Sequence, residues 1–257
     1  MNKIFSPLLI LFLSFFAVSQ VQAQFTRFPQ QGTITFEKKV NVYGIIQDQM
    51  KRRPDDTFSK LMFDEYKKKK SQFEVVKSTL SFSKGQTLFT PVESSSTDPS
   101  SVLAVQQNNI IATNTLDGTS IAQKKVFEEV YLVKDSVRKI NWKITDEVRN
   151  IAGYDCRRAN ALIMDSIYVV AFYTDVIPVS GGPESFTGLP GMILGVALPY
   201  EHITWFATEV LDQPVPADKM KAPVKGKPLD HKGLMGILQN ALKNWGDASE
   251  SLKAILL

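Results

Sequence analysis

Cysteine is nearly absent from this chain of 257 residues, since Cys156 is the single one. One cysteine cannot form a disulfide within the chain, so burial of apolar side chains must stabilise the fold. Histidine is also scarce, and neither His202 nor His231 lies at the close spacing to another potential ligand that metal-binding motifs use. We therefore expect no metal and no other cofactor.

Motifs of enzyme catalysis are missing as well. The sequence has no nucleophile elbow, no phosphate-binding glycine loop, no HExxH motif and no recognisable Ser/His/Asp arrangement. Glu128 and Glu129 are neighbours in an expected strand, where they would point to opposite faces and could not act as a pair. These absences favour a non-enzymatic protein, and we assign no catalytic residues.

Long apolar segments occur only at the N-terminus. Lys3 precedes the apolar residues 4–18, and Val21 and Ala23 hold the small-residue positions before Gln24. This order is typical of a signal peptide, and the segment is short for a membrane span of about 20 residues. We predict a signal peptide at 1–23, cleaved after Ala23, and a periplasmic or secreted protein without a transmembrane anchor. An uncleaved anchor is the alternative.

A large excess of one charge is also missing. The formal net charge is +4, and lysines and arginines alternate with acidic residues along most of the chain. A small excess of this kind concerns solubility, and we expect no nucleic-acid partner.

What the chain does contain is a series of strand-like segments with alternating apolar and polar residues. They lie at 32–42, 73–83, 86–92, 110–142, 151–164, 167–174, 192–198 and 202–211. Turn residues at 84–85, 117–118, 135–136, 165–166 and 199–200 separate them. The pattern predicts a mainly β fold with flanking helices, in which about eight to ten antiparallel strands form a strongly curved sheet or half-open barrel.

Three other segments complete the predicted organisation. A helix is expected at about 55–70, inserted in a β domain at 24–211, because Asp55 and Asp56 precede helically spaced apolar residues. A proline- and lysine-rich connection follows at 212–228. The segment 229–257 carries an apolar helical stripe and a stop signal at Gly246, so we expect one broken helix or two short ones that pack on the sheet.

The glycine- and proline-rich stretch 172–196 is the most distinctive part of the sequence. Its fixed and permissive backbone positions indicate one built conformation. In a structural interpretation, Leu189 and Met192 fill the sheet while Pro190 and Gly191 set the bend. In a functional interpretation, the loop 178–191 docks a partner or gates a ligand.

A second short motif places Tyr154, Cys156 and Ala159 within one strand. Tyr154 and Cys156 share a face and Ala159 lies on the other, which suggests a bulge near Arg157 and Arg158 or a sheet buried on both faces. The arginines could lower the pKa of the thiol, but a buried structural cysteine is the simpler interpretation.

Together these segments resemble the GLPGLI family. The matching residues are Ile34–Glu37 at the start, then 140–144, 151–159, 172–174 and 177–179. The residues assigned to the family motif are Tyr154, Cys156, Ala159, Tyr173, Thr174, Pro178, Gly182, Pro183, Gly188, Leu189, Pro190, Gly191, Met192, Ile193 and Leu194. Met192 and Phe172 depart from the family pattern, which usually has leucine and tryptophan there.

The resemblance implies a secreted or periplasmic protein, of a family found mostly in Bacteroidota, with no established activity and no catalytic residues to transfer. The strand-rich pattern is also similar to the curved sheets of outer-membrane lipoprotein carriers, which hold acyl chains in a groove. We therefore expect an envelope protein that binds a lipid or another apolar ligand. The alternatives are an accessory protein that docks to an outer-membrane assembly through 178–191, and a thiol- or metal-dependent enzyme that uses Cys156 and His202.

Overall fold

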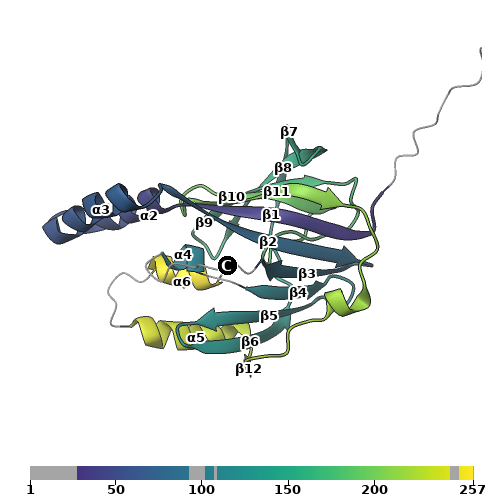
Figure 1. The fold of residues 1–257 in the computed structure, drawn as a ribbon. Helices are drawn as coiled ribbons and strands as arrows, with labels where there is room; N and C mark the ends of the chain where they lie inside the picture. Colours follow the sequence, from purple (N-terminus) through teal and green to yellow (C-terminus); the bar gives the residue numbers. More distant parts are fainter. Residues whose placement is uncertain (1–27, 93–101, 107–108, 244–248, 257) are drawn as a thin grey trace, which may run out of the picture.

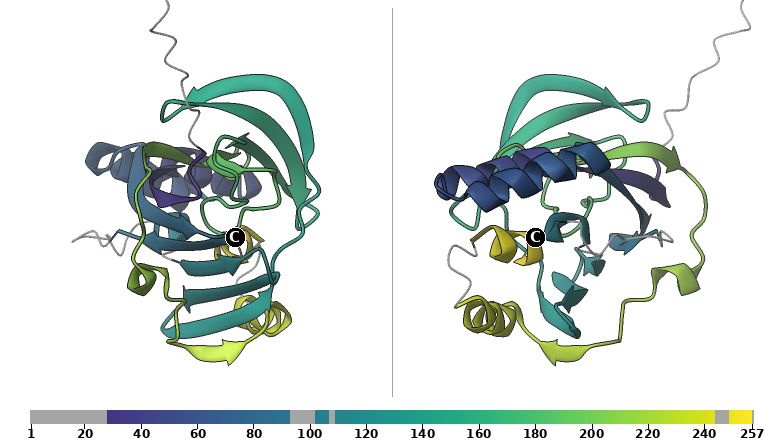
Figure 2. Two further views of the ribbon diagram at one scale, coloured as in Figure 1. Left: turned by 90° about the vertical axis from the view of Figure 1, so that its right-hand side faces the viewer. Right: turned by 60° about the vertical axis from the view of Figure 1, so that its left-hand side comes forward.

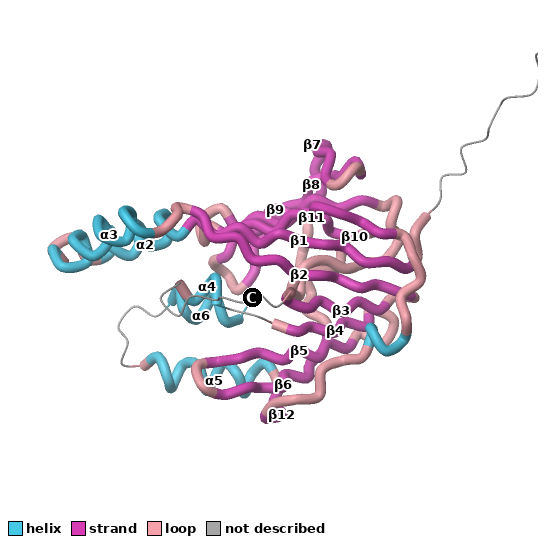
Figure 3. The backbone as a smooth tube through the Cα atoms, in the orientation of Figure 1, coloured by secondary structure: helices cyan, strands magenta, loops and turns pink. Residues whose placement is uncertain are grey.

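One open, curved sheet dominates the computed structural model, which describes residues 28–92, 102–106, 109–243 and 249–256 (Figures 1 and 3). Its strands are β1 (Gln31–Asn41), β2 (Phe73–Ser83), β3 (Gln86–Pro91), β4 (Ile110–Asn114), β5 (Thr119–Val126), β6 (Glu129–Ser136), β7 (Lys143–Ile151), β8 (Tyr154–Ile163), β9 (Ile167–Thr174), β10 (Met192–Leu198), β11 (Ile203–Leu211) and β12 (Lys227–Leu229). They are ordered β12-β6-β5-β4-β3-β2-β1-β11-β10-β9-β8-β7. The prediction of a mainly β, curved and open sheet is confirmed.

Two details of the predicted sheet are wrong. The described sheet has twelve strands, more than expected. It is also mixed, because β12 pairs with β6 in parallel, through Lys227 to Leu229. This strand lies at the end of the predicted connection 212–228, whose proline-rich sequence gives no strand signal. The edge of β6 supplies the pairing, and that partner is distant in the sequence.

The curvature follows from how short the connection between β6 and β7 is. These strands are ten positions apart in the sheet order, which would place them about 48 Å apart in a flat sheet. The six residues 137–142 join them, and the step from Ser136 to Lys143 can span only about 25 Å. The sheet must therefore curl until its two ends approach each other, as the views in Figure 2 show.

Most turns lie where the sequence predicts them. The turns at 84–85, 117–118 and 165–166 join neighbouring strands, with positive φ at Lys84, Gly85, Gly118 and Asp165. The turn expected at 135–136 is wrong, because β6 runs through these residues and the chain reverses at Phe127, whose φ is +53°. Residues 137–142, which the pattern assigns to a strand, belong to no strand because they bridge the two ends of the sheet, and the Val137 N–H donates to the Gly118 carbonyl (2.8 Å).

A helical hairpin, not a single helix, follows the first strand. The predicted helix is α3 (Thr57–Lys69), with Asp56 as its N-cap. Before it lies α2 (Val42–Arg52), for which the sequence pattern gave no helix and assigned only Val42 to a strand. Asn41 caps α2 by accepting a hydrogen bond from the Gly44 backbone N–H (3.0 Å). The two helices project from the sheet (Figure 1), and α3 leaves Phe58, Leu61 and Met62 exposed.

Three further helices pack against the inner, concave side. They are α4 (Leu103–Gln106), α5 (His231–Leu242) and α6 (Ser249–Leu256). Leu234 and Leu238 of α5 and Ile255 and Leu256 of α6 are buried in the main core. The break predicted at Gly246 lies outside the described residues. A short 3-10 helix, η1 (Ala217–Met220), lies in the connection before β12. None of the helices in the described part of the chain has the length and apolar character that a membrane span requires.

Candidate ligand-binding site

A cavity of about 300 Å³ lies between the concave face of the sheet and the C-terminal helices. The strands β4, β5 and β6 form one wall, and the residues that follow β6 form another. The helices α5 and α6 and the loop before β10 close it. The lining residues are Ile111, Ser120, Ala122, Lys124, Val133, Asp135, Ser136, Val137, Arg138, Lys139, Ser185, His231, Leu234 and Leu256.

The strand wall follows from the two-residue period of a β-strand. Ser120, Ala122 and Lys124 alternate along β5 and therefore point to the same inner face. Ile121 lies between them on the outer face, opposite Lys134 of β6. Apolar and polar side chains thus share the inner wall, with Ala122 beside Lys124.

Lys124 is the buried cation of this wall, with 6% of its surface exposed. Its ammonium group donates a hydrogen bond to the backbone carbonyl of Ile255 in α6 (2.9 Å). Burial lowers the pKa of Lys124 to about 8, an effect that the nearby Glu184 carboxylate opposes and the charges of Arg138 and Lys38 reinforce. A lysine at this inner position holds its charge at a cost in stability.

Arg138 is the second cation and lies just after β6. Its Nη2 donates a hydrogen bond to the Leu256 carbonyl oxygen (2.7 Å). Its Nη1 is also buried, yet it has no hydrogen-bond partner among the described residues. Burial lowers the pKa of this guanidinium, which stays charged at neutral pH because an arginine starts above 12.

The end of α6 meets both cations. The carbonyl groups of Ile255 and Leu256 belong to its last turn, where the helix dipole places partial negative charge. Lys124 and Arg138 therefore anchor α6 onto the sheet. These acceptors are neutral groups, so they supply no formal counter-charge.

The carboxylates of Asp135 and Glu184, near the cavity, accept hydrogen bonds from other groups of the protein. Asp135 accepts hydrogen bonds from the backbone N–H groups of His231 (3.1 Å) and Ser136 (2.7 Å), which hold its pKa below the ordinary value. The Glu184 side chain accepts a hydrogen bond from the Asn109 amide (2.8 Å). Burial, together with Arg138 and Lys124, lowers the pKa of His231, so its imidazole is neutral at pH 7.

The predicted loop 178–191 folds into the concave interior. The Met192 and Ile193 backbone N–H groups donate to the carbonyls of Ile177 (3.1 Å) and Gly181 (2.8 Å), so the loop continues the sheet inward. The Trp142 indole donates to the Thr187 carbonyl (2.9 Å), which ties the loop to the segment before β7. Gly191 has a φ of +152°, and a Cβ there would lie 2.1 Å from the Thr174 carbonyl oxygen.

Most motif residues of this loop are buried. Leu189 is 2% exposed, and Met192, Ile193 and Leu194 are fully buried. This arrangement agrees with the structural interpretation, in which Leu189 and Met192 fill the sheet. The loop also reaches the candidate site, because Ser185 lines the cavity and Glu184 lies near Lys124.

The Tyr154–Ala159 motif lies in β8, away from the cavity. Residues 157–163 pair with β9 without interruption, so β8 itself has no bulge at Arg157 and Arg158. The irregularity is in the neighbouring β7, between Ile144 and Val148. Cys156 and Ala159 are therefore on opposite faces, and both are fully buried. The sheet is covered on both sides here.

The cover over Cys156 comes from its cross-strand neighbours. Cys156 pairs with Arg149, whose guanidinium lies over the rings of Phe172 (5.7 Å) and Phe206 (4.8 Å). Burial raises the pKa of the thiol to about 12, with Asp155 adding to the effect. A thiol in this environment stays protonated and is a poor nucleophile.

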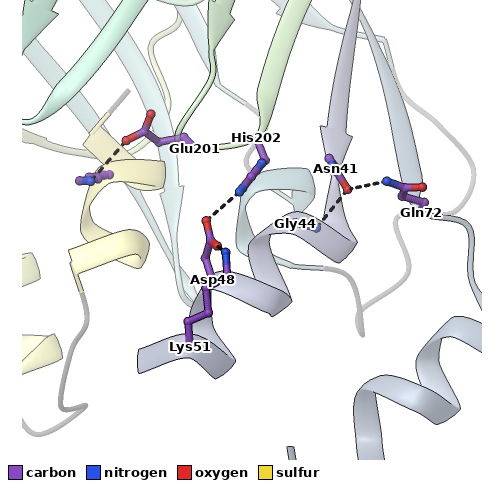
Figure 4. A network of polar contacts seen from close by, with 8 residues as sticks. Asn41, Gly44, Asp48, Lys51, Gln72, Glu201 and His202 are labelled. Carbon is purple, nitrogen blue, oxygen red and sulfur yellow. Dashed lines mark hydrogen bonds and ion pairs between the residues drawn. The ribbon is translucent and has the colours of Figure 1, made fainter. Parts of the chain in front are cut away.

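The two histidines belong to different parts of the structure: His231 lines the cavity, and His202 does not. His202 lies in the turn before β11, and its Nε2 is 2.8 Å from Asp48 Oδ2 of α2 (Figure 4). Asp48 also pairs with Lys51, and the neighbouring Glu201 pairs with Lys253 of α6. These contacts fix α2 and α6 against the turn. The described residues contain no group of three or more His, Cys, Asp or Glu side chains that could hold a metal ion.

Sequence reasoning missed the charged residues of the cavity. Lys124 stands between Ala122 and Val126, both buried on the inner face of β5. Lys38, which lies outside the cavity, stands in the same way between Phe36 and Val40 of β1. A lysine in the inward phase of an alternating strand is the signal that could have found them. Arg138 lies outside any strand, so no alternating pattern around it could have indicated that it faces the cavity.

Comparison with known families gives one short match. The model described as "Protein of unknown function (Porph_ging)", a family found in Bacteroidota, matches residues 162–195. This segment contains the end of β8, all of β9, the loop and the start of β10, and it carries most of the GLPGLI-like residues. No curated protein matches the chain.

Solved structures share the fold of most of the chain. Two structures of PNGF-II, in space groups P21 and C2, superpose with TM-scores of 0.52 and 0.51, at 13% identity. Each superposition covers 82% of this chain, but 34% and 33% of the PNGF-II chains. The chain thus spans about a third of the length of these structures. At this identity the similarity concerns the fold alone.

Proposed function

We propose that this protein is a non-enzymatic envelope protein that binds a small apolar ligand or lipid in the cavity. The proposal includes export to the periplasm or beyond after cleavage behind Ala23, and membership of the GLPGLI family. The observation that carries it is the cavity of about 300 Å³ with an apolar wall inside the curved sheet. Ligand pockets begin at about this volume and are mostly apolar, with a few polar groups.

The cost of such a space supports a role for it. The space is partly open to solvent, so its apolar lining lies against water instead of packed side chains. Ile111, Ala122, Val133, Leu234 and Leu256 all present apolar surface to the cavity. An apolar ligand would restore the missing contacts, and its binding would stabilise the folded state.

Docking through 178–191 has less support. Of the motif residues in this loop, Pro178, Gly188 and Pro190 are exposed, whereas Leu189 is buried. A docking surface made of these three would offer little apolar area for a partner. Replacing Leu189 would damage the core rather than test docking.

The test is native mass spectrometry of the protein purified gently from the cell envelope. We expect a bound species of small lipid or fatty acid mass. The Ala122→Phe variant, which fills the cavity from β5, should lose this species while keeping the circular dichroism spectrum. Ile121→Phe is the matched control, because Ile121 is the next residue on the outer face of the same strand.

Two results would contradict the proposal. One is a protein that carries no small molecule and binds none of a series of eight-carbon probes. The other is equal ligand occupancy in the Ala122→Phe and unmodified proteins, which would place binding outside the cavity.

A further inference from the structure

We propose that the ligand of this cavity carries an acidic group, which Arg138 and Lys124 bind, while the apolar wall holds its hydrocarbon part. This inference rests on the proposed function and specifies its ligand class: a small amphipathic acid with a carboxylate, sulfate or phosphate group. A neutral lipid would leave the buried Nη1 of Arg138 without an anionic acceptor.

The charged residues that line the cavity are mostly positive. Lys124, Arg138 and Lys139 line the cavity, whereas Asp135 is the lining carboxylate. Beyond the wall, the Glu184 carboxylate acts on both Lys124 and Lys38, and Lys38 adds a further positive charge. The described groups around the cavity therefore leave an excess of positive charge in a partly buried space, where an anion is the complementary ligand.

Neither Lys124 nor Arg138 donates a hydrogen bond to a described carboxylate. Their described acceptors are the carbonyls of Ile255 and Leu256, which are neutral. The buried Nη1 of Arg138 has no partner within the described part of the chain. A buried donor without an acceptor is unusual in folded proteins, and a guanidinium suits an anionic oxygen better than any neutral group.

Apolar side chains lie beside the two cations in the wall of the cavity. Ala122 precedes Lys124 by two residues on the same face of β5. Leu256, whose carbonyl binds Arg138, also lines the cavity. Charged and apolar surfaces therefore meet within one small space, which fits a ligand with an acidic end and a hydrocarbon end.

The size of the cavity limits the ligand. At about 30 Å³ for each non-hydrogen atom, the share of a water molecule in the liquid, a volume of about 300 Å³ holds about ten such atoms. Octanoate has this size and is the probe we choose. Octan-1-ol and octylammonium have the same hydrocarbon part with a neutral or a positive end.

The experiment is isothermal titration of the chain that begins at residue 24 with these three probes at pH 7. We expect octanoate to bind at least about tenfold more tightly than octan-1-ol, the effect of one charge-assisted hydrogen bond. Octylammonium should bind more weakly than octan-1-ol. Pentyl phosphate, which has ten non-hydrogen atoms like octanoate, forms a fourth arm and tests whether a phosphate group binds as a carboxylate does.

Two variants test whether Arg138 causes the preference for an acidic ligand. Arg138→Gln should lower octanoate affinity about tenfold more than it lowers octan-1-ol affinity. Lys134→Gln removes one positive charge from the outer face of the adjacent strand β6, so it should change neither affinity. Because Arg138 also holds α6, the change in octan-1-ol affinity shows how far the variant alters the cavity itself.

The outcomes separate the two proposals. Equal affinities for octanoate and octan-1-ol, or tightest binding of octylammonium, would overturn the inference and leave the proposed function standing. Binding of none of the four probes would overturn the proposed function itself.

Discussion

Replacing Lys124 by methionine should stabilise the protein while weakening its binding of an acid. In the folded state, burial lowers the pKa of this lysine to about 8 from an ordinary value of 10.5. Since one pKa unit corresponds to 1.36 kcal/mol, keeping the ammonium charged in the fold costs about 3 kcal/mol at pH 7. Its hydrogen bond to the Ile255 carbonyl returns about 1 kcal/mol. Methionine is one atom shorter and keeps most of the apolar stem, so we expect a net gain of about 2 kcal/mol.

The sign of the pH dependence follows from the same values. Below pH 8 both the folded and the unfolded chain carry the proton, so the full cost is present. Between pH 8 and 10.5 the folded chain releases the proton while the unfolded chain keeps it, so the cost falls, to about 1 kcal/mol at pH 10. The stabilising effect of Lys124→Met should therefore shrink as pH rises through this range.

The assay is urea denaturation of the unmodified protein and two variants at pH 7 and pH 10. Lys125→Met is the matched control, because Lys125 is the exposed neighbour on the outer face of β5. Glu184, Arg138 and Lys38 act on Lys124 electrostatically, and they remain in every protein compared. A Lys124→Met protein that is less stable than the unmodified protein at pH 7, or a difference that does not depend on pH, would refute the reasoning.

Three further predictions concern the loop, the thiol and the tie between the loop and β7. Gly191→Ala should destabilise the protein by several kcal/mol, because the new Cβ would meet backbone at 2.1 Å. Gly236→Ala in α5, where a Cβ meets nothing within 4 Å, should stabilise it by up to about 1 kcal/mol; thermal unfolding measures both, and equal effects would contradict the assignment. The Cys156 thiol should resist labelling by iodoacetamide at pH 8 until the protein is unfolded, and rapid labelling of the folded protein would show that it is accessible. Trp142→Phe should lose about 1 kcal/mol with its hydrogen bond to Thr187, as urea denaturation can check, and no loss would show that the bond does not stabilise the loop.

The sequence predicted those parts of the fold that depend on neighbouring residues. The hairpin between β2 and β3 was predicted because glycine at 85 accepts a positive φ. The start of α3 was predicted because Asp56 can cap it. The helix α2 was missed because Val42, Tyr43 and Ile45 favour strands, while its Asn41 cap is a weaker signal.

The candidate site was not predictable in the same way. Lys124 and Lys125 are adjacent and chemically identical in the sequence, and only the pairing of β5 between β4 and β6 places one inside and the other outside. Arg138 gains its role from contact with Leu256, which lies 118 residues further along the chain. Such contacts depend on how the sheet curls.

By itself, the sequence determined the alternation of strands and the positions of most turns, and it indicated one defined conformation for the glycine- and proline-rich loop, because these depend on φ, ψ and side-chain preferences of a few adjacent residues. The tertiary structure alone decided that the sheet curls, that α5 and α6 enter its concave side, and that a cavity lined by the buried Lys124 and the half-buried Arg138 lies between them. Burial and electrostatic effects on a residue are set by groups that are close in space and distant in sequence, and these become known only when the whole chain is folded.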